Sequence, residues 1–290
     1  MSIIILGAAG NLGGQLKIVL KEQTVLSWDR SDFDFLDFEE LKKRLQAEDP
    51  ELIINDADYN AVDKCESDDA EAALARRLNQ DLPGVLADFC LASGATLMHY
   101  STDYVFGGDQ RSAGAYSETD RPVPLNVYGR TKFGGEQEIA RRALSGLKYY
   151  LIRTSKLFGP RGENPQAKSS FFEIMLELAA KGGEIKAVDG EKSCFTYTPD
   201  LAQASKAIFY EKAPRGIYHL VNSGIATWYQ GAEYLFQKTG HKVDLKAITA
   251  NDWPRPAQRP DFSALANNRR PALRPWQSAL DEYLQSLNNK

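Results

Sequence analysis

The feature that most constrains the fold is the regular alternation of strand-like and helix-like segments across the first half of the chain. Short apolar runs are expected to form strands at residues 2–6, 24–28, 52–55, 95–100 and 149–153. Stretches with helical periodicity lie at 11–21, 38–47, 69–93 and 125–144, and Pro83 is expected to kink or break the third of these. This alternation predicts an α/β fold, a Rossmann-type doubly wound parallel sheet whose ligands bind at the carboxyl ends of the strands.

The second half of the chain has a different pattern. Residues 159–168 form a polar segment with glycine and proline, and residues 251–265 hold three prolines and are expected to be extended. The helices expected here are 171–180, 199–211, 228–239 and 275–287, with one strand at 217–221. We therefore expect a first domain over residues 1–155 and a smaller, interleaved α/β domain mainly over 156–290. Part of residues 200–245 is expected to return to the first domain.

Composition excludes several classes of function. The net charge is −4, so electrostatics give no reason to expect a nucleic-acid or membrane partner. The cysteines and histidines are few and isolated, which predicts neither a disulfide framework nor a metal site. The N-terminal apolar run is only about five residues long and has no basic leader, so we expect a cytoplasmic protein.

A glycine-rich turn follows the first expected strand and opens the first expected helix. It reads Gly7-Ala-Ala-Gly10-Asn11-Leu12-Gly13, a GxxGxxG spacing. Glycines at such a turn let the main chain approach a diphosphate, and the helix N-terminus stabilises its negative charge. The motif predicts a dinucleotide cofactor that is bound by Gly7, Gly10, Asn11, Leu12 and Gly13.

The end of the second expected strand bears on the choice of cofactor. Asp29 could bind the adenosine ribose hydroxyls of NADH, whereas Arg30 could accept the extra phosphate of NADPH. Asp34 and Phe35 follow where an adenine edge could be bound. Because both an acidic and a basic residue are present, the sequence does not decide whether the cofactor is NADPH or NADH.

The strongest chemical signal is the pair Tyr128 and Lys132. Residues four apart share one face of a helix, and a tyrosine can donate a proton to a ketone oxygen that receives a hydride. We expect the nearby ammonium to lower the tyrosine pKa from its reference value of about 10. Thr102, which follows the fourth expected strand, could hydrogen-bond the same oxygen. The three residues predict a carbonyl reductase.

Several longer segments carry a resemblance to a known family. They are NAVDKCE (60–66), HYSTDYVFGG (99–108), ETDRPVPLNVYGRTKFGGE (118–136), IRTSKLFGP (152–160), TYTPDLA (196–202), YHLVNSG with the following Trp (218–228) and RPDFSAL (259–265). In this order they resemble the dTDP-4-dehydrorhamnose reductase family of extended short-chain dehydrogenases/reductases. The resemblance implies NAD(P)H-dependent reduction of the C4 ketone of a nucleotide-linked deoxysugar by a monomer or homodimer.

The resemblance also implies roles for individual residues. Thr102, Tyr128 and Lys132 would be catalytic, with Lys132 also holding the nicotinamide ribose. The loop that contains Ala57 would run beside the cofactor diphosphate. The residues that would contact the substrate are Asp103, Tyr104, Lys156 and Arg259.

This chain departs from the family pattern at four of these places. Asp56 and Asp58 stand where the family has small neutral residues beside the diphosphate. Lys156 replaces a tryptophan that would pack on the deoxysugar, and Ala264 replaces an arginine. A carboxylate beside phosphates is repulsive, and a cation in place of an aromatic wall changes what the pocket accepts.

Three functions therefore remain open. The first is reduction of dTDP-4-dehydro-L-rhamnose, and the second is the same chemistry on a different nucleotide-sugar, suggested by Lys156 and Ala264. The third is a non-catalytic regulatory or binding homologue, suggested by Asp56 and Asp58. A dehydratase is disfavoured because Tyr104, rather than a second acidic residue, follows Asp103.

Overall fold

A six-stranded parallel sheet forms the centre of the molecule. The computed structural model describes residues 2–109, 111, 114–164 and 167–288. The strands are β1 (Ser2–Leu6), β2 (Thr24–Trp28), β3 (Leu52–Asn55), β4 (Thr96–Thr102), β5 (Lys148–Thr154) and β10 (Gly216–His219). Their order is β10-β5-β4-β3-β1-β2, and every neighbouring pair is parallel. The Rossmann-type sheet predicted from the sequence is confirmed.

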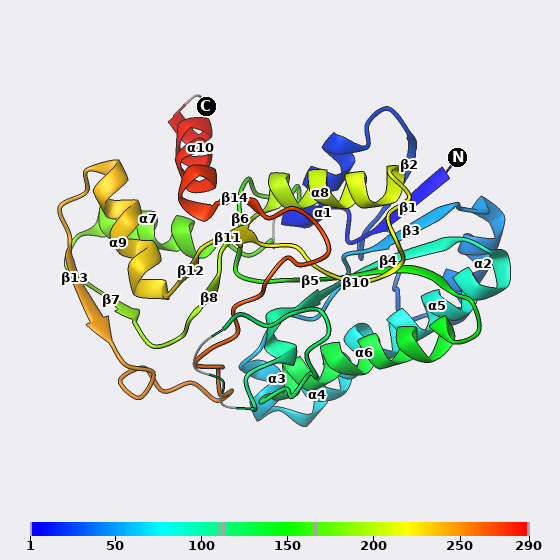
Figure 1. The fold of residues 1–290 in the computed structure, drawn as a ribbon, viewed down its shortest axis with the longest axis horizontal. Coiled ribbons are helices and arrows are strands. Elements are labelled where there is room, and N and C mark those ends of the chain that lie inside the picture. The colour runs from blue at the N-terminus through cyan, green and yellow to red at the C-terminus, as the bar shows by residue number, and fades with distance from the viewer. Residues whose placement is uncertain (1, 110, 112–113, 165–166, 289–290) are drawn as a thin grey trace.

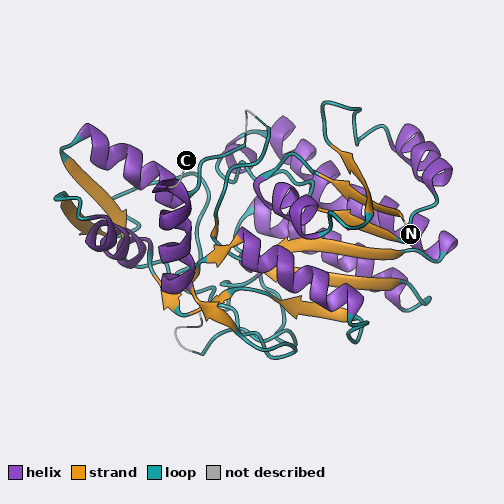
Figure 2. Ribbon diagram, turned by 90° about the horizontal axis from the view of Figure 1, so that it is seen from above, coloured by secondary structure: helices purple, strands orange, loops and turns teal. Residues whose placement is uncertain are grey.

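Helices cover both faces of this sheet (Figures 1 and 2). One face is covered by α1 (Asn11–Val19) and α8 (Thr198–Tyr210), and the other by α2 (Phe38–Glu48), α5 (Leu82–Ser93) and α6 (Val127–Ala143). The strands are apolar on both sides because each side packs against helices. The first core includes Ile3, Ile5, Leu16 and Leu201, and the second includes Ile4, Leu41, Leu86 and Ile139.

The expected helix at 69–93 is divided, as Pro83 predicted. It consists of α4 (Asp69–Arg76), a π-helical turn (Arg77–Asp81) and α5, with Pro83 in the first turn of α5. Proline has no amide hydrogen, so it cannot donate the i→i−4 bond that would continue α4. Asn79, in this wider turn, is fully buried and hydrogen-bonds to the main chain of Tyr59.

A second lobe packs beside the carboxyl ends of the strands. It contains α7 (Phe171–Lys181), α9 (Trp228–Thr239) and α10 (Trp276–Asn288) around a two-stranded parallel sheet of β7 (Glu184–Val188) and β13 (Asp244–Ile248). Its core is aromatic, with Phe158, Phe172 and Phe195 at the centre. The sequence analysis did not predict β7 or β13. Figure 1 shows this lobe at the left.

Short elements complete the chain between the two halves. They are α3 (Lys64–Ser67), a 3-10 turn (Asp103–Val105), β6 (Leu157–Phe158), β8 (Ser193–Cys194), β9 (Thr196–Tyr197), β11 (Asn222–Ser223), β12 (Ile225–Ala226) and β14 (Leu273–Pro275). Residues 251–265 form neither helix nor strand, in agreement with the three prolines.

A buried ionic network ties β10 to the rest of the sheet. Arg153 on β5 donates to both carboxylate oxygens of Glu136 on α6, at 3.0 and 2.6 Å. The Ser101 hydroxyl donates to the same carboxylate, and Arg153 Nη1 lies 3.3 Å from His219 Nε2 on β10. Removing Arg153 or Glu136 would leave the other charge buried and unpaired, which typically costs about 3–5 kcal/mol.

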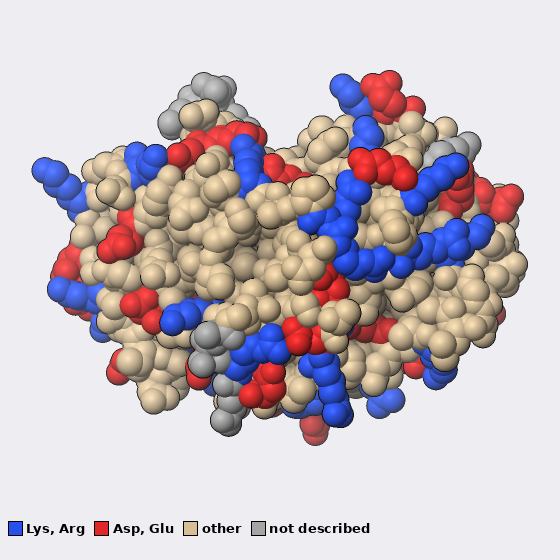
Figure 3. Space-filling view, viewed as in Figure 1, with Lys and Arg blue, Asp and Glu red and all other residues tan. Residues whose placement is uncertain are grey.

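The face shown in Figure 3 carries charged side chains of both signs. Acidic and basic side chains are interspersed there, with one short band of Lys and Arg beside α8. Within residues 2–288 as described, no helix is both long and apolar enough to cross a membrane.

Candidate active site

A cavity of about 820 Å³ opens at the carboxyl edge of the large sheet, beside the second lobe. Most of the residues predicted from the sequence line it together: Gly7, Gly10, Asn11, Leu12, Asp29, Arg30, Phe35, Ala57, Thr102, Asp103, Tyr104, Tyr128, Lys132 and Lys156. Three predicted residues, Gly13, Asp34 and Arg259, are not part of its lining. The topology thus brings residues from five strand ends and from the second lobe to one space.

The glycine turn at one end of the cavity has the shape that a diphosphate requires. Gly7 has φ +82°, and a Cβ atom there would lie 2.8 Å from the main-chain carbon of Asp56. At Gly13 a Cβ atom would lie 2.3 Å from the carbonyl oxygen of Gly7. Gly10, the N-cap of α1, provides no side-chain cap. The first turn of α1 therefore faces the cavity at close range and can accept an anion.

Two carboxylates lie beside this turn. Asp56 accepts a hydrogen bond from the Gly13 amide, and Asp58 is the next acidic residue along the same loop. Burial raises the pKa of both groups, and the charge of Asp58 raises the pKa of Asp56 further. Asp56 thus occupies part of the helix terminus that an anion would use. The Gly13 amide favours its ionised form, but burial and Asp58 outweigh that contact, so its pKa is raised on balance.

The end of β2 forms the opposite wall of this part of the cavity. Asp29 accepts from the Ala9 amide at 3.3 Å, so its carboxylate supports the glycine turn. Arg30 and Phe35 line the cavity beside it. Asp34 instead accepts from the Leu36 amide at 2.9 Å and stabilises the local turn. An acidic and a basic group thus stand side by side at this wall of the cavity.

Tyr128 lies in the first turn of α6, next to the end of β4. The Asn126 side chain caps α6 by accepting from the Gly129 amide at 2.8 Å. Gly129 allows close packing, because a Cβ atom there would lie 2.3 Å from the carbonyl oxygen of Tyr104. The Tyr128 phenol is buried, and the Thr102 hydroxyl lies close enough to oppose the rise in pKa that burial causes. Both residues line the same cavity.

The ionisation of Tyr128 differs from the sequence expectation. Burial raises the pKa of Tyr128 well above its usual value, and the charge of Asp58 raises it further. The expected lowering of the Tyr128 pKa is wrong for this structure, because burial and then Asp58 dominate. The Lys132 ammonium donates to the Tyr100 carbonyl at 2.6 Å. Burial lowers the Lys132 pKa, and Asp58 opposes that change. The phenol is therefore held in its protonated, proton-donating form.

Asp103 lines the cavity at the end away from the glycine turn, together with Tyr104, Lys156 and Trp228. It accepts from the Ser263 hydroxyl at 2.5 Å and from the Thr102 hydroxyl at 3.2 Å. Burial raises its pKa, and the Ser263 hydrogen bond opposes the rise. The carboxylate therefore links the strand that carries Thr102 to the 251–265 segment. Tyr104 packs edge-on against Tyr128, with 5.9 Å between ring centroids.

Lys156 has an unusual setting beside Asp103. Its main chain is left-handed, with φ +39°. The ammonium donates to the carbonyls of Glu191 and Ala226, both at 3.2 Å, and lies 4.1 Å from the ring centroid of Trp228. Burial lowers its pKa to about 8. The cation is thus held against an aromatic face at the cavity wall.

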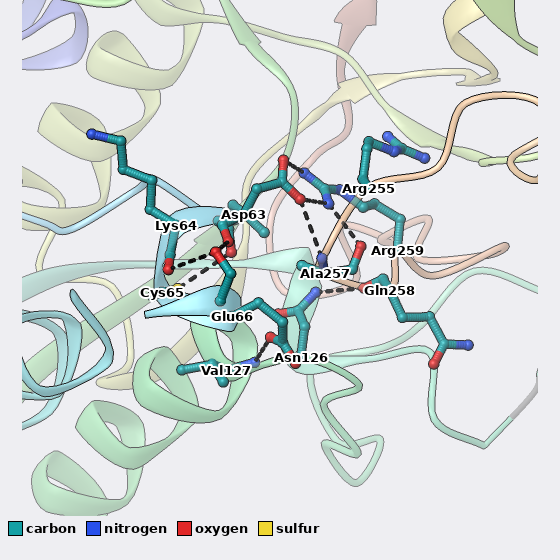
Figure 4. A network of polar contacts seen from close by, with 12 residues as sticks. Asp63, Lys64, Cys65, Glu66, Asn126, Val127, Arg255, Ala257, Gln258 and Arg259 are labelled. Atoms are coloured by element: carbon teal, nitrogen blue, oxygen red, sulfur yellow. Dashed lines mark hydrogen bonds and ion pairs between the residues drawn. The ribbon is translucent and has the colours of Figure 1, made fainter. Parts of the chain in front are cut away.

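Arg259 lies outside the cavity lining and is paired. Its guanidinium forms a two-point ion pair with Asp63 and donates to the Ala257 carbonyl at 2.7 Å (Figure 4). Asp63 also accepts from the Ala257 amide at 3.2 Å. The Arg259 hydrogen bonds hold the pKa of Asp63 below its usual range. In this arrangement Arg259 anchors the 251–265 segment to α3.

Two further contacts in Figure 4 join this anchor to α6. Asn126, the α6 cap, donates to the Gln258 carbonyl at 2.8 Å, and the Val127 amide donates to Glu66 at 2.7 Å. The segment that carries Arg259 is therefore attached to the helix turn that carries Tyr128.

Sequence reasoning missed several residues that line the cavity. They are Asn60, Val62, Lys64, Leu78, Thr154, Asn164, Lys168 and Trp228 among others. Lys168 could have been found, because it ends the polar Gly/Pro-bearing segment already noted at 159–168. Leu78 could not, because its position depends on the π-helical turn.

Known proteins match this chain over nearly its whole length. The model of the RmlD substrate binding domain family matches residues 1–289. A dTDP-4-dehydrorhamnose reductase of Mycolicibacterium smegmatis is 35% identical, over 98% of this chain and 85% of that protein. A probable dTDP-4,6-dihydroxy-2-methyloxan-3-one 4-ketoreductase of Streptomyces antibioticus is 34% identical, over 99% and 96%.

Solved structures agree with these relatives. A dTDP-4-dehydrorhamnose reductase of Clostridium acetobutylicum has a TM-score of 0.90 and 32% identity, covering 99% of this chain and 100% of the other. One of Bacillus anthracis, in complex with NADP, has a TM-score of 0.89 and 29% identity, covering 98% and 99%. With the family model and the sequence relatives, these structures show that the chain belongs to the dTDP-4-dehydrorhamnose reductase family.

Proposed function

We propose that this chain reduces the C4 ketone of dTDP-4-dehydro-L-rhamnose to the alcohol of dTDP-L-rhamnose with NADPH. The observation that carries the proposal is the meeting of Thr102, Tyr128 and Lys132 in one cavity with an open glycine turn. Family membership supports the same activity. The proposal covers a monomer or a homodimer.

The glycine turn and its surroundings would bind the cofactor, which supplies a hydride to C4 when bound. Residues 1–155, with β10 and α8, would form this half of the protein. Gly7, Gly10 and the first turn of α1 would hold the diphosphate, and Asp29, Arg30 and Phe35 would hold the adenosine end. We favour NADPH because Arg30 can pair with its extra phosphate and because a relative was solved with NADP.

Tyr128 would donate the proton that O4 of the sugar requires. Its raised pKa keeps the phenol protonated at neutral pH, which is the form that a reduction consumes. Thr102, beside the phenol, would orient the phenol and contact O4 of the sugar. Lys132 would hold the nicotinamide ribose from its place behind Tyr128. Asp103 and Tyr104 would contact the sugar beside them.

The test is an assay of the purified protein with NADPH and dTDP-4-dehydro-L-rhamnose. The loss of nicotinamide absorbance is followed over time, and the alcohol product is then identified in the finished reaction. We expect turnover, and we expect Tyr128→Phe to reduce kcat by roughly two to four orders of magnitude while NADPH still binds. Tight NADPH binding without turnover of any keto-sugar would support the non-catalytic alternative instead.

A second substrate is favoured by Lys156. A buried ammonium at the sugar end could accept a hydrogen-bonding group that an aromatic wall would exclude. One relative is named as a probable ketoreductase for a different dTDP-linked sugar. If this chain prefers such a sugar, Lys156→Trp should raise the ratio of kcat/KM for dehydrorhamnose to kcat/KM for that other sugar. An unchanged ratio would count against the second substrate.

A further inference from the structure

One cation near the glycine turn has no part in the function proposed so far. Lys168 ends the segment after β6 and lines the cavity together with Gly10, Asn11 and Asp58. Its ammonium donates to the Asn60 carbonyl at 2.7 Å. An ammonium has three donors, so this bond leaves it able to bind a further acceptor.

The main chain around Lys168 is fixed to the start of α1 by one side chain. Asn11 donates to the Lys168 carbonyl at 3.0 Å and accepts from the Gly162 amide at 2.9 Å. Gly162 lies directly on the turn, because a Cβ atom there would be 2.3 Å from the Ala9 carbonyl oxygen. Lys168 is thus held within one side-chain length of the helix terminus that faces the cavity.

The loop opposite Lys168 is equally well fixed. The side chain of Asn79, which is fully buried, accepts from the Tyr59 amide at 2.9 Å and donates to the Tyr59 carbonyl at 3.0 Å. Asp58 and Asn60 flank Tyr59. The Lys168 ammonium therefore reaches across the cavity to a rigid wall, and the charge of Asp58 acts on it.

Of the other described lysines of the lining, two lie elsewhere. Burial lowers the Lys168 pKa, and the third lysine, Lys64 in α3, is close enough for its charge to lower it further. Lys132 is bonded to the Tyr100 carbonyl behind Tyr128, and Lys156 lies on Trp228 at the sugar end. Asp56 and Asp58 place two acidic groups beside the turn that must accept an anionic diphosphate. A cation on the cavity side of Asp58 would offset that repulsion and contact the phosphate oxygens.

We propose that Lys168 is a cofactor-binding residue, whose ammonium contacts the diphosphate of the dinucleotide and offsets the charge of Asp58. The inference rests on the proposed use of a dinucleotide at this site and adds a residue to it. Because the diphosphate is common to NADPH, NADH and ADP-ribose, Lys168 contributes alike to the affinity for all three.

The test is a set of equilibrium titrations without any sugar. NADPH and NADH are followed by nicotinamide fluorescence and ADP-ribose by its displacement of NADPH. We expect Lys168→Met to raise the three dissociation constants about tenfold, and Lys168→Arg to stay within about threefold because the charge is kept. Lys168 is on the surface, so the variants should fold, which circular dichroism checks.

Lys17→Met is the matched control. Lys17 pairs with Glu163 at 2.7 Å and so ties the same segment to α1 from outside the cavity lining. We expect it to change the three constants less than about twofold, as for an exposed ion pair. Equal losses in both variants, or no loss in Lys168→Met, would overturn the inference. Normal binding by the wild-type protein with no turnover of keto-sugars would instead reject the proposed function alone.

Discussion

The two ends of the cavity are built from different parts of the chain. At the cofactor end, the surface is main chain, where Gly7 and Gly13 leave no room for side chains. At the end proposed for the sugar, side chains form the surface, among them Lys156 against Trp228. The Arg259–Asp63 ion pair holds the 251–265 segment from outside the lining. A main-chain surface changes only when a glycine is lost, whereas paired side chains can be exchanged singly. We therefore expect the loss of a turn glycine at the first end to weaken cofactor binding most, and single exchanges at the second end to change specificity.

The largest effect is expected from Gly13→Ala. The added Cβ would lie 2.3 Å from Gly7 O and 2.8 Å from Ala8 Cα, so α1 must move away from the turn. We expect NADPH affinity to fall at least about a hundredfold, corresponding to roughly 2.7 kcal/mol. Fluorescence titration of NADPH measures it.

Gly14→Ala is the control for that variant. The nearest atom to its added Cβ is 3.8 Å away, an ordinary contact, and alanine favours the helix by up to about 1 kcal/mol. We expect cofactor affinity within about twofold of wild type and an unchanged or higher Tm. If Gly13→Ala binds NADPH as well as Gly14→Ala does, the main-chain description of this end is wrong.

The contrast between the two ends also explains what the sequence could predict. The turn at Gly7–Gly13 and the residues Thr102, Tyr128 and Lys132 lie within short motifs after predictable strands, so their meeting followed from topology. The partner of Arg259 is 196 residues away in the sequence, and no local pattern indicates it. β7 and β13 were missed because they carry exposed charged residues, such as Glu184 and Lys186, and lack the continuous apolar run by which the buried strands were recognised.

A smaller effect is expected at Arg259, where the ion pair allows two functions. We propose that Arg259 exchanges Asp63 for the nucleotide part of the substrate. Both Arg259→Met and Asp63→Asn loosen the anchor of residues 251–265. If Arg259 also contacts substrate, its loss should raise the substrate KM about tenfold more than the loss of Asp63 does. Steady-state kinetics of the two variants decide whether Arg259 contacts the substrate. Equal KM values would mean that Arg259 only anchors residues 251–265.

Asp56→Asn tests the acidic group within the main-chain end. Burial, and then Asp58, raise the Asp56 pKa, so the folded state binds this proton more tightly than the unfolded chain does. The stability contributed by that proton is present at low pH and is lost as pH rises through the raised pKa. The variant should therefore be more stable than wild type at neutral pH, by about 1 kcal/mol or roughly 2 °C in Tm, and the difference should shrink toward acid pH.

The same substitution should improve cofactor binding. The deprotonated carboxylate repels a diphosphate at the α1 terminus, so wild-type affinity for NADPH should weaken as pH rises. In Asp56→Asn we expect affinity several-fold higher at neutral pH and a flatter pH dependence. Titrations at a series of pH values measure both, and a steep dependence retained in the variant would assign it to another group.

The smallest effect is expected from Lys156→Met at the side-chain end. Methionine has a similar length and can still pack on Trp228, but it removes the charge and the two hydrogen bonds to carbonyls. Because burial lowers the Lys156 pKa to about 8, the wild-type ammonium loses its proton as pH rises through that value. If the ammonium contacts the sugar, the substrate KM of the wild type should rise a few-fold between pH 7 and pH 9, whereas that of the variant should not. Identical profiles would mean that Lys156 only closes the wall between Glu191 and Ala226, and the preference for an altered sugar would then have to come from another side chain at this end.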